Sequence, residues 1–230
     1  MIVEALGGLC NRLRVILSRM PKPGEPPLVV YWAPDTEVAG GRWDECFEPL
    51  PCLEVVYERP AYVDIATSDN APVVGWKPRL LSLTPVPAVA ARIDELRDSM
   101  GGRYDAMFMR RTDGTIVAHI EGNFTPDEAF RQWAQLAPGP LFLATDNGET
   151  QRKVRGWVGE RLVVEGELGG QEVQTDRTRH QALPGSVVNL YVYVHADRVL
   201  GSGGSSFSHT IDVLRACYLA KKQGVPLWID

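Results

Sequence analysis

The second half of the chain alternates between short apolar runs and stretches with helical spacing, and this alternation limits the possible folds. Apolar runs predict four strands, at residues 104–109, 141–144, 161–164 and 198–200. Helices are predicted between or after them, at 125–137, at 149–158, and from about 206 to 222. The first of these is expected to begin with Thr125 as its N-cap and Pro126 at its first position, followed by an acidic first turn at Asp127 and Glu128. Strands that alternate with helices of about ten residues form βαβ units with parallel pairing. The sequence therefore predicts an α/β fold.

The first half gives a weaker signal of the same kind. Strands are predicted at 2–6 and 28–32, and helices at 10–20 and 88–99. In the first helix Leu9, Leu13, Ile16 and Leu17 form an apolar stripe, while the arginines lie elsewhere. Residues 33–85 predict short strands and long loops. Two segments complete the pattern: 186–196 fits a helix or a strand, and 226–229 fits a last strand.

Composition restricts the function more than the fold. The net charge of −5 argues against a nucleic-acid partner, because phosphate neutralisation supplies most of the affinity in such complexes. The sequence contains no apolar run long enough to span a membrane and no visible signal peptide. Its 4 cysteines form no Cys-x-x-Cys pair, which disfavours a zinc site and indicates a reducing compartment. We expect a cytoplasmic protein or a soluble domain of a longer one.

A glycine- and serine-rich stretch follows the last strand of the second half. Residues 201–208, here called the Gly-Ser segment, read Gly-Ser-Gly-Gly-Ser-Ser-Phe-Ser and precede a predicted helix. Glycines let a ligand approach the backbone, and a helix N-terminus favours negative charge. The segment therefore fits an anion site. A flexible turn that carries serines fits the local sequence equally well.

Polar clusters follow three of the predicted strands. Arg110 and Arg111 follow the strand at 104–109, Thr145-Asp146-Asn147 follows the strand at 141–144, and the Gly-Ser segment follows the strand at 198–200. Ligands of parallel sheets bind at the carboxyl ends of the strands, so these clusters are predicted to share one edge. Residues 7–11 hold the equivalent position in the first half and could face them across a cleft.

The two arginines favour a phosphate ligand, because planar guanidinium groups bind phosphate through paired hydrogen bonds. Neighbours on a strand point to opposite faces, so one arginine is expected to meet the ligand. The other is expected to pair with Asp113 or Asp146. A surface Arg-Arg pair without a ligand remains an alternative. Thr145-Asp146-Asn147 could equally be a turn that caps the next helix.

Taken together, these motifs resemble the fucosyltransferases. Gly7-Gly8-Leu9-Cys10-Asn11-Arg12-Leu13 is similar to the family's N-terminal glycine motif, and Arg110-Arg111-Thr112-Asp113 is similar to the Arg-Arg-Thr-Asp motif of the α1,6-fucosyltransferases. Leu143-Ala144-Thr145-Asp146-Asn147 resembles their Ala-Thr-Asp-Asp segment, and residues 204–208 resemble their Gly-Ser-x-Phe-Ser motif. Each motif is short, but all four occur in the family's order along nearly the whole chain.

The resemblance implies a GT-B-like fold, with two Rossmann-like α/β/α domains, a cleft between them and a reduced first domain. Residues 1–100 would form the acceptor-side domain and residues 101–230 the domain that binds the nucleotide sugar. The implied activity is inverting transfer of fucose from GDP-fucose to a glycan acceptor. No metal or other cofactor would be required, and GDP would be the product.

The resemblance also implies roles for single residues. Arg110 and Arg111 would bind the diphosphate, Asp146 would contact the nucleoside, and Ser205, Ser206 and Phe207 would complete the donor site. Asn11 would approach the donor from the first half. Asp113 is the best candidate for the general base, although the role of an arginine partner is favoured for it. Glu121 and His119 also lie near the arginine strand, and an ordinary loop histidine is the favoured interpretation of His119. His209 could contact phosphate or be simply exposed to solvent.

Three departures from the family pattern affect these expectations. Phe108 replaces a histidine that usually contacts the nucleoside, Cys10 replaces a glycine and so restricts a turn, and Asn147 replaces an acid. The first half is also short for the family. A non-catalytic module that binds nucleotide sugars or glycans is therefore an alternative function. A phosphatase or kinase is less consistent with the sequence, which has no Walker lysine.

Overall fold

The computed structural model of the chain contains two parallel β-sheets of four strands each. It describes residues 1–34, 40–67, 75–111, 119–120, 122–168 and 183–225. The first sheet has the order β3-β2-β1-β4 and the second the order β7-β6-β5-β8. Every pairing within the two sheets is parallel, so the α/β class predicted from the alternation of strands and helices is confirmed.

The first sheet uses short strands from the N-terminal third of the chain. Its strands are β1 (Ile2–Ala5), β2 (Leu28–Tyr31), β3 (Leu53–Val56) and β4 (Ile65–Thr67). Helix α1 (Leu9–Ser18) joins β1 to β2, and its predicted stripe is buried. Two short 3-10 helices, η1 (Trp43–Glu45) and η2 (Pro78–Ser82), lie in the segments that sequence patterns left unassigned.

The central strands of the second sheet are longer than those of the first. This sheet contains β5 (Asp105–Met109), β6 (Leu141–Thr145), β7 (Leu162–Val164) and β8 (Arg198–Gly201). Every residue of β5 and β6 is buried, as expected for strands that helices cover on both faces. Asp105 begins β5 and pairs with Arg198 at the start of β8, so both strands run toward the same edge.

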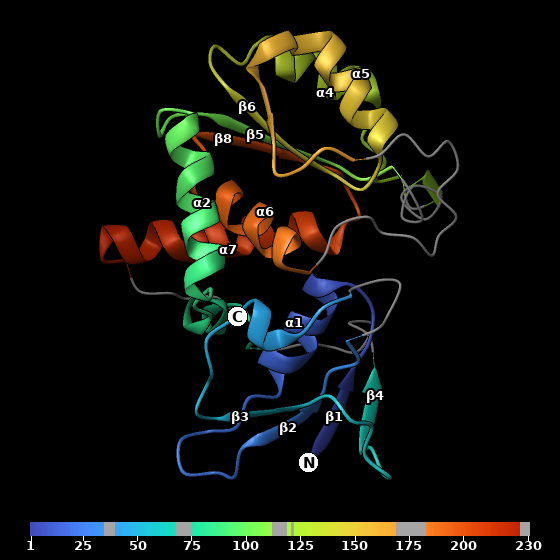
Figure 1. Cartoon of the computed structure of the whole chain (residues 1–230), viewed down its shortest axis with the longest axis vertical. Helices are drawn as coiled ribbons and strands as arrows, with labels where there is room; N and C mark the ends of the chain where they lie inside the picture. Colours follow the sequence, from blue (N-terminus) through green and yellow to red (C-terminus); the bar gives the residue numbers. More distant parts are fainter. Residues whose placement is uncertain (35–39, 68–74, 112–118, 121, 169–182, 226–230) are drawn as a thin grey trace.

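In the part of the chain that the structure describes, five α-helices accompany the second sheet, and a 3-10 helix precedes β7. They are α2 (Pro87–Ser99), α4 (Asp127–Gln135), α5 (Gly148–Val158), η3 (Gly159–Arg161), α6 (Leu183–His195) and α7 (Ser206–Gln223). Figure 1 shows α4 and α5 on one face of this sheet and α2, α6 and α7 on the other. The second half is therefore a three-layered α/β/α unit, as the GT-B-like prediction requires.

The two halves share one hydrophobic core. Helices α2, α6 and α7 lie between the second sheet and helix α1, which covers the first sheet (Figure 1). The larger buried cluster accordingly contains Val3 and Leu13 from the first half together with Phe142 and Leu190 from the second. A smaller cluster packs α4 and α5 on the outer face of the second sheet. In the described first half, α1 is the sole α-helix on its sheet, which fits the reduced first domain.

Several predictions are corrected in detail. Residues 186–195, which fitted a helix or a strand, belong to helix α6, and the short strands expected within 33–85 are β3 and β4. Helix α4 has Pro126 as its N-cap, so the interpretation of Thr125 as the cap residue is wrong by one position. The predicted strand at 226–229 lies outside the described residues. Within the described part of the chain, every helix is too short or too polar to cross a membrane.

A half-buried histidine at the end of α6 should make stability depend on pH. Burial, and after it the charge of Arg97, lowers the pKa of His195 to about 4, although Asp94 opposes the shift. The unfolded chain therefore binds a proton at higher pH than the folded one, and stability falls as pH drops from about 6.5 toward 4. We expect His195→Gln to remove about 1 kcal/mol of the stability difference between pH 6.5 and pH 5, because solvent screening around a half-exposed side chain reduces the full effect of the shift.

Urea unfolding of the wild type and the variant at both pH values measures this effect. Equal pH dependence in the wild type and His195→Gln would contradict the assignment.

Candidate functional site

The three polar clusters that follow β5, β6 and β8 meet at one edge of the second sheet. In the sheet register Met109 pairs with Thr145, and Phe108 pairs with Gly201. Hydrogen bonds then join the chain just beyond the strands. The backbone N–H of Arg110 donates to Ser202 Oγ at 2.9 Å, and the N–H of Arg111 donates to Asp146 Oδ1 at 2.9 Å. The predicted convergence at the carboxyl ends of the strands is confirmed.

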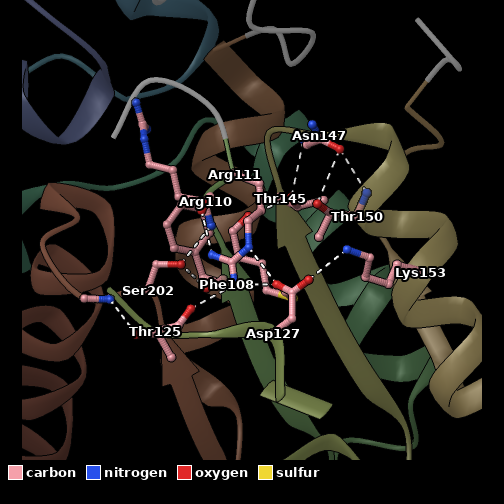
Figure 2. Close-up of polar contacts among 12 residues, drawn as sticks. Phe108, Arg110, Arg111, Thr125, Asp127, Thr145, Asn147, Thr150, Lys153 and Ser202 are labelled. Carbon is pink, nitrogen blue, oxygen red and sulfur yellow. Dashed lines mark hydrogen bonds and ion pairs between the residues drawn. The ribbon is translucent and has the colours of Figure 1, made fainter. Parts of the chain in front are cut away.

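The side chain of Arg111 is fixed by the protein itself. Its Nε donates to Asp127 Oδ1 at 2.9 Å, and its terminal nitrogens donate to the carbonyls of Arg110 and Thr125, each at 2.9 Å. The guanidinium carbon also lies 5.1 Å from the ring of Phe124 and 5.2 Å from that of Phe130. Figure 2 shows this cluster around Asp127. Arg111 thus ties the end of β5 to the start of α4.

Asp127 is the centre of a charged cluster, because Lys153 of α5 also donates to it, at 2.8 Å. Burial alone would raise the pKa of Asp127, but the hydrogen bonds from Lys153 and Arg111 outweigh it and hold the pKa below its usual value. The aspartate was expected only as part of an acidic first turn. The sequence suggested Asp113 or Asp146 as the partner of the structural arginine. In the structure the side chain of this arginine, Arg111, pairs with Asp127.

Arg110 has a different environment. Its Nε lies 3.8 Å from Asp146 Oδ2, and in Figure 2 its side chain extends away from the Arg111–Asp127 contacts. The backbone of Arg110 is held by Ser202, at the start of the Gly-Ser segment. The contacts of Arg111 confirm that one arginine of the pair is structural, while contact of Arg110 with a ligand stays a prediction.

The Gly-Ser segment packs closely against the loop before α4. The N–H of Gly203 donates to Thr125 Oγ1 at 3.0 Å, and a Cβ on Gly203 would overlap the carbonyl oxygen of Asn123. Only glycine fits this approach of two backbones. Thr125, taken from sequence as a helix cap, therefore positions the Gly-Ser segment. Its side chain and its carbonyl connect Gly203 with Arg111.

A pocket of about 500 Å³ opens at the Gly-Ser segment. Its lining consists of residues 201–206, Ser208, His209 and Asp212, together with Arg14 from helix α1 of the first half. Ser205 is the N-cap of α7, and the first N–H groups of a helix have no partner within it. Among the described residues, the buried hydroxyl oxygens of Ser205 and Ser208 have no hydrogen-bond partner. These groups suit an anion with oxygen acceptors.

Phe207 and Asn147 have structural roles beside the pocket. Phe207 packs on Phe108, with ring centroids 4.7 Å apart, so the residue that replaces the family's histidine forms an apolar contact. Asn147 accepts a hydrogen bond from the Thr150 N–H at 2.9 Å and is the N-cap of α5. The capping interpretation of that turn is correct for Asn147, while Asp146 contacts the arginines. Asp113 lies outside the described residues, so its role as base stays a prediction.

The N-terminal glycine motif places its residues differently from expectation. Arg12 was assigned to the polar side of α1 but is buried: its Nε donates to the Gly7 carbonyl at 2.9 Å and a terminal nitrogen to the Ala33 carbonyl at 3.1 Å. Burial lowers the pKa of Arg12 to about 10. Gly7 has a φ of +85° and lies against Asn11. Cys10 is helical, so it does not restrict the glycine turn.

Arg14, His209 and Asp212 are pocket residues that sequence reasoning missed or undervalued. Arg14 belongs to no recognised motif, and only its place on the same helix as Asn11 could have suggested it. Its guanidinium carbon lies 5.2 Å from the ring of Trp76. His209 was weighed as a phosphate contact, and its ring lies 5.8 Å from the same tryptophan.

The two parallel sheets, with the pocket at the carboxyl ends of the second one, define a GT-B-like α/β protein with a fucosyltransferase-like fold. A solved structure of NodZ α-1,6-fucosyltransferase soaked with GDP-fucose matches with a TM-score of 0.59 and 15% identity, covering 93% of this chain and 92% of NodZ. The structure of fucosyltransferase NodZ from Bradyrhizobium matches with a TM-score of 0.60 and 14% identity, over 93% of each chain. A NodZ structure co-crystallised with GDP gives 0.60 and 14%, over 93% and 92% of the two chains.

This likeness is one of fold. No protein-family model and no curated protein matches the sequence.

Proposed function

We propose that the protein is a glycosyltransferase that transfers fucose from GDP-fucose to a glycan acceptor, with inversion and without a metal ion. The observation that supports this most strongly is the edge where Arg110, Asp146 and the Gly-Ser segment converge beside the N-terminus of α7. The NodZ structures, whose fold this chain shares, include one soaked with GDP-fucose and one crystallised with GDP.

The proposed chemistry assigns the leaving diphosphate to this edge. The acceptor oxygen attacks C1 of fucose, the bond from C1 to the β-phosphate oxygen breaks, and GDP carries away the electron pair. Arg110 and the N–H groups at the start of α7 stabilise the growing negative charge. Arg111 supports the site by holding β5 against α4. The acceptor proton passes to a base, for which Asp113 is the candidate, and Asn11 approaches from the first half.

Release of GDP from GDP-fucose tests this proposal. Incubation with GDP-fucose, first alone and then with a panel of glycan acceptors, should give free GDP and a fucosylated product, while GDP-mannose should give much less. Addition of a chelator should leave the rate unchanged. Binding of GDP-fucose without release of GDP across a broad panel would contradict the transferase function.

A non-catalytic module that binds nucleotide sugars or glycans is the second candidate. The packing of Phe108 on Phe207 favours it, because a polar contact that the family resemblance predicts at this position is replaced by an apolar one. Such a module would bind GDP and GDP-fucose with similar affinity and show no turnover. The same GDP-release experiment therefore separates the two candidates.

A further inference from the structure

Arg14 brings a cation from the first half of the chain into the pocket of the Gly-Ser segment. It lies on α1, while every other residue that lines this pocket comes from β8, the segment after it or α7. Helices α1 and α7 pack against each other, and Arg14 lines the pocket together with the N-terminal residues of α7. The pocket therefore combines groups from both halves of the chain.

The position of Arg14 is set by a buried tryptophan. Trp76 is 2% exposed, and the guanidinium of Arg14 lies over its ring at 5.2 Å. His209 packs against the same ring, with centroids 5.8 Å apart. A guanidinium that lies on an aromatic face keeps its positive charge. Trp76 thus positions two nitrogen-bearing side chains at one wall of the pocket.

Positive and negative groups lie at different ends of the pocket. Positive potential comes from Arg14 and from the N-terminus of α7, where Ser205 is the cap. The pocket's carboxylate, Asp212, lies further along the helix. An anion is therefore repelled from the Asp212 end and attracted to the Gly-Ser end. Buried hydroxyl oxygens of Ser205 and Ser208, without partners in the described part of the chain, lie at that same end.

We propose that Arg14 is a donor-binding residue that contacts the diphosphate of the nucleotide from the first half of the chain, alongside the N-terminus of α7. This rests on the proposed function for the identity of the nucleotide, but the recognised chemistry is the diphosphate itself. A diphosphate carries more negative charge than a single phosphate and can use both Arg14 and the α7 N-terminus. The ligand then bridges the two halves of the chain.

Calorimetric titration with GDP, guanosine and inorganic pyrophosphate tests the inference. Arg14→Met keeps the length and apolar contacts of the side chain on Trp76 but removes its donors. The substitution should weaken the binding of GDP and of pyrophosphate by about 10- to 100-fold, which is the loss expected for one or two charge-assisted hydrogen bonds. The affinity for guanosine should not change. Arg14→Lys should recover part of the affinity.

The matched control is Arg19→Met on the C-cap of the same helix. Arg19 donates to Val15 O and Ser18 Oγ at 3.1 Å each and does not line the pocket, so GDP affinity should not change. Equal pyrophosphate and GDP affinities in the wild type and Arg14→Met would overturn the inference and leave the proposed function standing. Pyrophosphate binding that depends on Arg14, without GDP binding, would support the inference and contradict the proposed function. If the protein bound neither GDP nor pyrophosphate, the inference and the proposed function would both be contradicted.

Discussion

Replacing Arg111 with alanine is expected to destabilise the folded protein by about 2–4 kcal/mol. The substitution removes the hydrogen bonds that the Arg111 side chain donates to Asp127 and to the carbonyls of Arg110 and Thr125. It also leaves a gap between the rings of Phe124 and Phe130. Lys153 still pairs with Asp127, which keeps the loss below that of a fully orphaned buried charge.

Chemical unfolding in urea measures this loss directly. Arg131→Ala is the matched control, because Arg131 is an exposed residue of α4 close to Asp127 in sequence and should change stability by less than about 0.5 kcal/mol. Wild-type stability in Arg111→Ala, combined with lost GDP binding, would show that Arg111 is a ligand residue and that its contacts with Asp127 carry little energy.

Replacing Arg110 with alanine is expected to weaken GDP binding by about 100-fold and to change stability by no more than about 1 kcal/mol. Its ion-pair distance to Asp146 is long, at 3.8 Å, and Asp146 keeps the backbone hydrogen bond from Arg111. The backbone contact of residue 110 with Ser202 does not depend on the side chain. Arg110→Lys should retain part of the affinity, since it keeps the charge but loses the paired donors.

The control for this variant lies just before the start of β5, at the opposite end from Arg110. Arg103→Ala removes an exposed arginine that pairs with Asp197, far from the carboxyl end of β5, and should leave GDP binding intact. Unchanged GDP affinity in Arg110→Ala, with wild-type binding established, would remove Arg110 from the donor site. The Arg110 and Arg111 variants together therefore test whether the adjacent arginines divide into a ligand residue and a structural one.

Sequence patterns predicted the second half of the fold well because its strands are continuous apolar runs. The runs at 104–109 and 141–144 agree closely with β5 and β6, which are buried along their whole length. For residues 33–85 the sequence predicted no strand bounds, because β3 and β4 are short and only partly buried. Their apolar residues are too few to show a period. Spacing could not assign α6 because its tyrosines and valines suit both a helix and a strand.

The candidate site was predictable where it depends on strand ends and not where it depends on tertiary contacts. The edge of the sheet follows from topology, so Arg110, Asp146 and the Gly-Ser segment could be placed together from sequence. The partnership of Arg111 with Asp127 spans 16 residues across a loop, and no local pattern encodes it. Arg14 reaches the pocket through the packing of α1 on α7, which sequence spacing does not reveal.

Titration of the wild-type protein with GDP, compared with UDP and ADP, tests the central claim most directly. The account predicts saturable binding of GDP that is tighter than that of UDP or ADP. The same GDP concentration should raise the melting temperature, because a ligand that binds only the folded state stabilises it. Absence of binding and of thermal stabilisation with all three nucleoside diphosphates would contradict the account.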